Sequence, residues 1–258
     1  MTAAARNEPP VALRRLLPDA GTLTADELVA ELRPWEHAPA RRPHVAVNMV
    51  HTTDGRAALE GRTAPISSVA DRQLFHALRT RVDAVMVGAG TLRIERYGRI
   101  VRDAARREQR RMAGLEPDPL AIVVSGSLDL PVDLPLLQDP DSRVVIVTAS
   151  QRSLDGARAE VEYLRLVPVD LAVALAQLRS AYGVRAILCE GGPHLNASLV
   201  AAGLIDELFL TTFPVIAGGP GALTIMDDAV LQTPPVLTLR WLLEHRGELF
   251  ARYALGER

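Results

Sequence analysis

Two glycine-containing turns decide the fold of this chain. The first is Val85-Met86-Val87-Gly88-Ala89-Gly90-Thr91, and the second is Ile187-Leu188-Cys189-Glu190-Gly191-Gly192. Each turn follows a short apolar run that is typical of a buried strand and leads into a stretch with helical spacing. Ligands bind at the carboxyl ends of parallel strands, and glycine there lets the backbone approach a phosphate without a Cβ in the way.

Two such turns in one sheet could hold an extended dinucleotide, because the helix after each turn presents free N–H groups and the positive end of its dipole. The Rossmann fingerprint is not met, since its third glycine would fall at Arg93. The turns alone therefore leave two interpretations open, a nucleotide-binding site and a pair of tight strand-to-helix turns.

The rest of the chain alternates in the same way. We expect buried strands over residues 44–50, 84–87, 120–124, 144–147, 186–189 and 207–213, with helices over 69–81, 102–111, 171–182 and 194–202. This order predicts an α/β fold with a mostly parallel central sheet and helices on both faces. Residues 236–243 and 248–254 predict a C-terminal antiparallel β-hairpin that turns at Arg246-Gly247.

The chain divides into two parts. Residues 1–41 are rich in Ala, Pro, Arg and Glu, and we expect them to form an N-terminal extension packed on the main domain. Within it, Thr24 followed by Glu27 predicts a capped short helix over 24–32. Residues 42–258 are expected to form a single domain.

Composition excludes several classes of protein. All 29 basic residues are Arg and none is Lys, which excludes a Walker-type phosphate loop and a Schiff-base enzyme. The single cysteine, Cys189, allows no disulfide within the chain and no Cys-x-x-Cys zinc site, so we expect a cytoplasmic protein. The formal net charge of -2 indicates no nucleic-acid partner. No signal-peptide pattern and no apolar run of about 18 residues is present, so no membrane partner is expected, and the histidine spacing predicts no metal site.

Three motifs resemble the pyrimidine reductases of riboflavin biosynthesis. They are Asn48 to Arg56, then Leu78-Arg79 with Asp83 to Thr91, and finally Glu190-Gly191-Gly192 with Leu195, residues 203–208 and Pro214. The resemblance runs from about residue 42 to the C-terminus. It implies a dihydrofolate-reductase-like fold, a reductase domain over 42–258, NADPH as hydride donor and a homodimer. The implied reaction converts 5-amino-6-(5-phosphoribosylamino)uracil, a small-molecule substrate, to its ribityl form. The zinc-deaminase pattern of the bifunctional members is absent, so only the reductase half is expected.

The resemblance also implies site residues. The expected cofactor contacts are Val50, Ser67, Gly88, Ala89, Gly90, Thr91, Glu95, Ser125, Gly191, Gly192, Leu195 and Asn196, and the expected substrate contacts include Asn48 and Arg79. Arg96 and Tyr97 join the substrate set because a guanidinium can bind an anion and an aromatic ring can stack, although surface solvation and packing are the alternatives. Ser125, Thr148 and Arg152 are candidates for selecting the 2′-phosphate of NADPH.

Two acids adjoin the expected substrate side. Glu190 is the candidate that polarises and orients the reacting centre, with a cap on its turn as the alternative. Asp54 is the second catalytic candidate, although Asp-Gly is a common turn pair.

The chain also departs from the family's pattern. After Gly90-Thr91 the family has Asp, then Asn or Asp, then Pro-x-Leu, whereas this chain has Glu95 to Arg99, and Pro65 replaces an expected Trp. Most of these changes lie on the substrate side. Reduction of a pterin such as dihydrofolate is therefore an alternative activity, and a non-catalytic nucleotide-binding protein is a third possibility.

Overall fold

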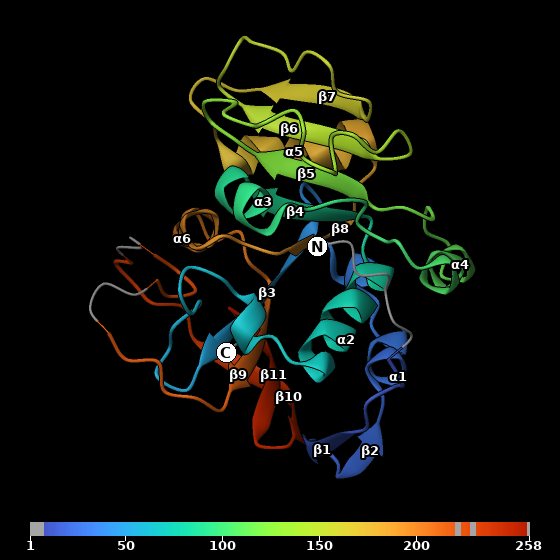
Figure 1. The fold of residues 1–258 in the computed structure, drawn as a ribbon, viewed down its shortest axis with the longest axis vertical. Coiled ribbons are helices and arrows are strands. Elements are labelled where there is room, and N and C mark those ends of the chain that lie inside the picture. Colours follow the sequence, from blue (N-terminus) through green and yellow to red (C-terminus); the bar gives the residue numbers. More distant parts are fainter. Residues whose placement is uncertain (1–7, 220–222, 228–230, 257–258) are drawn as a thin grey trace.

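The computed structural model describes residues 8–219, 223–227 and 231–256. Its apolar runs pair into an eleven-stranded sheet in the order β2-β1-β10-β11-β9-β3-β8-β4-β5-β6-β7 (Figure 1). The parallel part comprises β3 (His44–Thr52), β4 (Ala84–Gly88), β5 (Leu120–Val124), β6 (Arg143–Thr148), β7 (Glu160–Arg165), β8 (Ala186–Cys189) and β9 (Glu207–Phe213). β1 (Leu13–Leu17), β2 (Gly21–Leu23), β10 (Leu237–His245) and β11 (Glu248–Leu255) add the antiparallel part. The predicted mostly parallel sheet is confirmed.

Helices cover both faces of this sheet, as predicted. On one face, α1 (Ala25–Ala30), α2 (Val69–Leu78) and α3 (Ala89–Glu95) bury side chains in one apolar cluster. On the other face, α5 (Leu171–Tyr182) and α6 (Pro193–Ala201) bury theirs in a second cluster. α4 (Ala104–Met112) lies beyond these layers, and short 3₁₀ turns occupy Pro34–His37, Ala64–Ile66 and Arg79–Arg81.

The alternation of β3 fixes which side chains can reach a site. Val45, Val47 and Met49 belong to the cluster on the α5 and α6 face, whereas Ala46 belongs to the cluster on the α2 face. Because side chains alternate along a strand, Asn48 and Val50 share the α2 face with Ala46. The two expected contact residues on β3 therefore face the same side of the sheet.

Residues 8–41 extend the sheet at its antiparallel edge. β1 pairs with β10, with Arg14 opposite Glu244, and α1 packs beside α2 (Figure 1). The predicted cap is confirmed, because Thr24 and Glu27 form a reciprocal capping box. β1, β2 and β7 were not predicted. β1 and β7 carry charged residues among apolar ones at the sheet's antiparallel and parallel ends, so their sequences resemble exposed segments.

The C-terminal hairpin is confirmed. Arg246 and Gly247 form its two-residue turn with φ values of 51° and 82°, the left-handed conformation that such turns require. No helix in the described ranges is long and apolar enough to span a membrane.

Candidate active site

The two glycine turns lie side by side. Met86 on β4 pairs with Cys189 on β8, and the Gly88 N–H donates to the Gly191 carbonyl at 2.7 Å. A Cβ on Gly88 would lie 3.4 Å from the Gly192 nitrogen, and one on Gly192 would lie 2.6 Å from Thr91 Oγ1. The turns therefore form one continuous surface, which we call the double corner (residues 88–91 and 190–192). The short distance between the two turns requires glycine at Gly192.

Gly90 differs from its neighbours in the double corner. A Cβ built on Gly90 meets no atom within 4 Å, and the residue is exposed. Packing does not explain a glycine here, whereas room for a bound group does. Gly88 and Gly192 are also the N-cap residues of α3 and α6, and neither helix start has a side-chain cap. Backbone N–H groups at this edge are thus available to an anion.

Two expected cofactor contacts lie beneath the double corner instead of on its surface. Asn196 is fully buried and donates from Nδ2 to the Ile225 carbonyl at 2.9 Å, and Leu195 packs in the apolar cluster behind the sheet. Both residues lie on the inward side of α6 and support the corner from below. Sequence spacing identified their segment but could not show which way they point.

Arg79 and Glu190 form a buried ion pair beside the double corner. Arg79 donates from Nε to Oε1 of Glu190 at 2.7 Å and from Nη2 to Oε2 at 2.8 Å, and each residue is 6% exposed. The third contact of Arg79 is the Ile100 carbonyl, at 2.7 Å. The two residues were expected to contact the substrate separately. The structure shows instead that they bind each other.

Aromatic rings and a second arginine hold this pair in place. The guanidinium of Arg79 lies 4.2 Å from the Phe75 ring centroid and 5.6 Å from that of Tyr97. Burial first, and the nearby Glu190 next, raise the pKa of Tyr97 well above its ordinary value. Arg110, fully buried, donates to the carbonyls of Arg79 and Val82. The charge-rich sequence of residues 102–111 is typical of a solvated helix face, but Arg110 is buried because the helix end after α2 needs a donor for its free carbonyls.

Asp54 has a structural place in the β3 turn. Its carboxylate accepts from Thr52 Oγ1 at 2.5 Å, from the Ala217 N–H at 3.1 Å and from the Gly218 N–H at 2.8 Å. These hydrogen bonds lower the pKa of Asp54, Thr52 contributing most. An acid so strongly held as its anion is a poor proton donor, so the geometry favours the turn role over the expected catalytic one.

Other expected contacts have protein partners. Arg96 is exposed and pairs with Asp133 at 3.1 Å, which supports the solvated alternative. Glu95 accepts from Thr63 Oγ1 at 2.7 Å, and Ser125 is buried where β5 ends. Ser67 donates from Oγ to Asp71 Oδ2 at 2.6 Å.

A pair of buried acids on the α2 side of the sheet was not identified from the sequence. Asp71 on α2 is 6% exposed and Glu248 on β11 is 3% exposed, and Ser68 donates from Oγ to Glu248 Oε2 at 2.6 Å. Burial raises the pKa of Asp71, and it raises the pKa of Glu248 to about 7. In the sequence, the position of Asp71 three residues after Ser68 is typical of a helix-capping residue. The signal was the adjoining Ser67, which gives that carboxyl a second partner.

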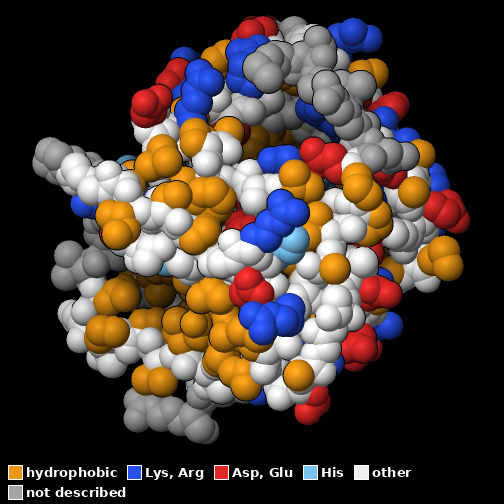
Figure 2. Space-filling model, turned by 60° about the horizontal axis from the view of Figure 1, so that its bottom comes forward, with side chains coloured by type: hydrophobic (Ala, Val, Ile, Leu, Met, Phe, Trp, Pro, Cys, Tyr) orange, Lys and Arg blue, Asp and Glu red, His pale blue; other side chains and the backbone are white. Residues whose placement is uncertain are grey.

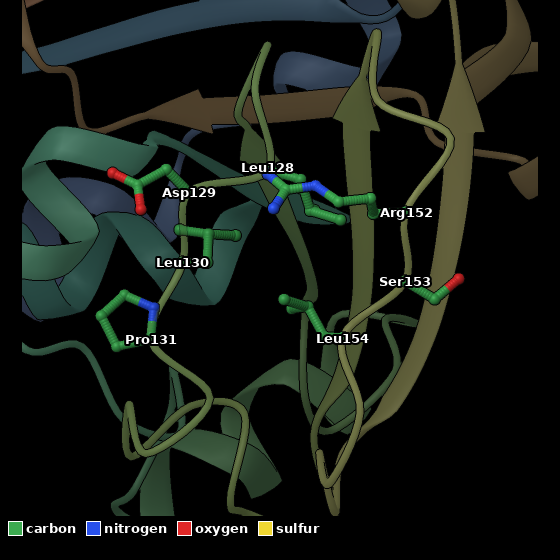
Figure 3. Close-up of a pocket in the computed structure, with 7 residues that line it drawn as sticks. All are labelled: Leu128, Asp129, Leu130, Pro131, Arg152, Ser153 and Leu154. Carbon is green, nitrogen blue, oxygen red and sulfur yellow. The ribbon is translucent and has the colours of Figure 1, made fainter.

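A cavity of about 300 Å³ lies next to the ends of β5 and β6. Residues 128–131 form one wall and residues 152–154 form the other, and Figure 3 shows the Arg152 side chain reaching across toward Leu128. Arg152 donates from Nη2 to the Ser127 carbonyl at 2.7 Å. The cavity lies at the same sheet edge as the double corner, because β5 is the neighbour of β4.

The sheet order and the double corner define an α/β domain of the dihydrofolate-reductase-like reductase class. The sequence matches the family described as the RibD C-terminal domain over residues 43–247, and the chain belongs to this family. It is 33% identical over 191 residues to 2,5-diamino-6-ribosylamino-4(3H)-pyrimidinone 5′-phosphate reductase of Archaeoglobus fulgidus, covering 72% of this chain and 87% of that protein. It is 32% identical to the protein of the same name from Methanothermobacter thermautotrophicus, covering 84% and 95%.

A solved structure supports the fold. The pyrimidine reductase-like protein of Corynebacterium diphtheriae superposes with a TM-score of 0.75 at 24% identity, covering 92% of this chain and all of that one. The expected family, fold class and oxidoreductase activity in the riboflavin pathway are therefore confirmed. Membership of a reductase family implies a nicotinamide cofactor in general.

The buried ion pair predicts a strongly coupled mutational response. Arg79→Met leaves the Glu190 carboxylate buried without its partner and should lower the free energy of unfolding by about 3–5 kcal/mol. Arg79→Met with Glu190→Leu removes both charges and should cost less than Arg79→Met alone. Urea unfolding measures all three values, and Arg14→Ala, which breaks an exposed pair with Glu244, should cost less than about 1 kcal/mol. Additive losses in the double variant would contradict a coupled pair.

Proposed function

We propose that the chain catalyses the NADPH-dependent reduction of a ribosylaminopyrimidine 5′-phosphate to its ribitylamino form. The observation that carries this proposal is the double corner, which lies beside an apolar strand face and a buried Arg79–Glu190 pair. The names of the two archaeal relatives support the substrate class. We place the enzyme in the cytoplasm, since its one cysteine is buried and unpaired and burial raises the pKa of the Cys189 thiol to about 12.

The residues present fit a dinucleotide. The double corner offers backbone N–H groups for the pyrophosphate, and the open space over Gly90 gives it room. Val50 supplies an apolar wall on the α2 face for the nicotinamide ring. When bound, reduced nicotinamide supplies a hydride.

Arg152 is our candidate for selecting NADPH over NADH. It lies exposed at the cavity beside β5 and β6, where its guanidinium could bind a 2′-phosphate (Figure 3). Thr148, another candidate, is fully buried, and its hydroxyl already donates to the Gly126 carbonyl and accepts from the Ser150 N–H. The structure therefore favours Arg152 of these two.

The Arg79–Glu190 pair beside the double corner acts on the substrate side of the site. The Glu190 carboxylate stabilises positive charge that develops at the reacting sugar carbon, and Arg79 fixes the position of that carboxylate. Asn48 lies on the same strand face and is expected to contact the pyrimidine.

Cofactor titration tests the phosphate and cofactor assignments. Gly90→Val puts a side chain into the open space and should weaken NADPH binding by about 100-fold or more, because the pyrophosphate then meets carbon, while the thermal midpoint changes little. Arg152→Ala should weaken NADPH but leave NADH unchanged. Gly21→Ala, on an exposed edge strand far from the double corner, is the control. Unchanged NADPH affinity in Gly90→Val would contradict the pyrophosphate assignment.

Turnover decides among the candidate activities. Purified protein with NADPH should consume the diamino or the amino-uracil form of the ribosylaminopyrimidine 5′-phosphate, and the ribityl product is identified by mass spectrometry. Dihydrofolate is the competing substrate. Oxidation of NADPH by dihydrofolate alone would replace the proposed activity with a pterin reductase, and tight NADPH binding without any turnover would indicate a non-catalytic nucleotide-binding protein.

We also propose a homodimer through the hairpin face of the sheet. Leu237, Leu239 and Leu249 of β10 and β11 are each more than a third exposed, and Figure 2 shows apolar side chains gathered in broad patches on the side that carries this hairpin. Leu239 lies opposite Tyr253, on the sheet face that carries α5 and α6. These two helices cover that face only at the parallel strands. Such a face is buried by a second copy in many oligomers. Light scattering should give twice the 27.9 kDa chain mass, and Leu239→Glu should give a monomer; a wild-type monomer would contradict the dimer.

A further inference from the structure

We propose that Asp71 is the acid that gives the proton consumed in the reduction, and that the neighbouring Glu248 keeps a proton on this pair of carboxyls. This inference rests on the proposed function, because a reduction must occur beside Asp71 for its proton to be used. Glu248 is a positioning residue in this scheme, since it affects the reaction only by changing how tightly Asp71 holds its proton.

Asp71 lies on the substrate side of the sheet. Its carboxyl is hydrogen bonded to Ser67 Oγ at 2.6 Å and to the side chain of Thr211 on β9. Thr211 pairs with Val50 on β3, and residues paired in a parallel ladder face the same side. Asp71, Thr211 and Val50 therefore line one side of the sheet, where Asn48 also points. Ser67 itself is only half-buried, so this group of side chains is not wholly closed off from solvent.

Three other candidate donors near the site are less suited to give a proton. Both oxygens of Glu190 accept hydrogen bonds from the Arg79 guanidinium. The carboxylate of Asp54 accepts from two backbone N–H groups and a hydroxyl, which lower its pKa. Tyr97 holds its proton too tightly, because burial raises its pKa. Among the residues that the structure describes, Asp71 and Glu248 are the carboxyls whose pKa values are raised.

The surroundings explain why the pair keeps a proton. Burial is the largest cause of the raised pKa in both groups, and the charge of Asp71 raises the pKa of Glu248 further. Glu248 Oε1 is buried without a hydrogen-bond partner in the described part of the chain, a costly position for a carboxylate oxygen. The two carboxyls therefore titrate as a coupled pair, in which the negative charge of one makes the proton of the other harder to remove.

The charged and titratable groups around the pair are few. On α2, Arg72 lowers the pKa of Asp71, and it is itself paired with Glu8 at 3.4 Å. On β10, His245 stands opposite Glu248 in the ladder and binds the Ala12 carbonyl through Nδ1. On β3, His51 contacts Thr212 Oγ1 at 3.0 Å, and burial lowers its pKa. Within the described residues, none of these groups forms an ion pair with Asp71 or Glu248, so the charge of neither carboxyl is neutralised directly.

The chemical step balances with one proton. The ribosylamine opens to an imine, whose carbon accepts a hydride from the reduced nicotinamide. The π electron pair of the C=N bond moves to nitrogen, and nitrogen takes the proton of Asp71. The substrate is reduced by two electrons, the nicotinamide is oxidised, and Asp71 is left as a carboxylate that regains its proton from water.

A measurement on the protein without ligands tests the proton itself. Difference infrared spectroscopy over a pH titration should show the C=O stretch of a protonated carboxyl that disappears as pH rises through about 7, and Asp71→Asn and Glu248→Gln should each change it. Exposed Glu108→Gln is the matched control and should leave the band unchanged. A wild-type protein without this band would overturn the proposal, whether or not the variants fold.

Stability gives a second readout that is independent of catalysis. The pKa of Glu248 is raised from 4.5 to about 7, so the folded state holds a proton that the unfolded chain has lost between these values. The urea midpoint of the wild type should therefore fall as pH rises from about 4.5 to about 7, and this component of the fall should be absent in Glu248→Gln. The same slope in Glu248→Gln would contradict the assignment.

Kinetics then connects the proton to the reaction. Asp71→Asn should lower kcat by about 100-fold or more while NADPH affinity stays within a factor of about two. Glu248→Gln removes a negative neighbour, so the alkaline decline of kcat should move to lower pH. Normal kcat in folded Asp71→Asn would refute the donor role. Absence of turnover in the wild type would instead refute the proposed function, and with it the use of the proton in catalysis. The infrared band reports separately on whether Asp71 and Glu248 hold a proton.

Discussion

The hydrogen bond from the Gly88 N–H to the Gly191 carbonyl, 2.7 Å long, joins the two strand ends on which the site depends. It can form because β4 and β8 are neighbours and because no Cβ separates Gly88 from Gly192. Two strand-to-helix turns that are about a hundred residues apart in the chain thereby become one surface. The open position of Gly90, the starts of α3 and α6, and the cavity beside β5 all lie along the same edge of the sheet.

Beyond this edge, two pairs of buried ionisable residues lie on the α2 face of the sheet, and their surroundings differ. Arg79 and Glu190 are buried together and bind each other through two charge-assisted hydrogen bonds. Asp71 and Glu248 form no ion pair among the described residues, and burial raises the pKa of both. The α2 face therefore carries one ion pair and one pair of carboxyls with raised pKa values, and our proposals assign the first to charge stabilisation and the second to proton donation.

Much of the architecture could be predicted from the sequence. Short apolar runs followed by glycine placed β4 and β8 with their turns, and the Arg246-Gly247 pair placed the hairpin, because each rests on local conformational preference. β1 and β7 could not be predicted, since their charged residues resemble those of exposed segments. β7 is the last strand at its end of the sheet, and β1 is followed only by the short strand β2. The burial of Arg110 was also hidden, because it depends on free carbonyls after α2 that only the folded chain brings near.

The site was predicted less completely for a related reason. A motif identifies a residue, but the direction of its side chain and its partner depend on the packing of distant elements. Arg79 and Glu190 are 111 positions apart, so their pairing is invisible in the sequence, and Asn196 points inward although its neighbours form the corner. The most direct test of the central claim is a crystal structure of the NADPH complex. The account predicts the pyrophosphate against the backbone at residues 88–91 and 191–192 with the nicotinamide beside Val50, and NADPH bound away from this edge, or the two turns separated, would contradict it.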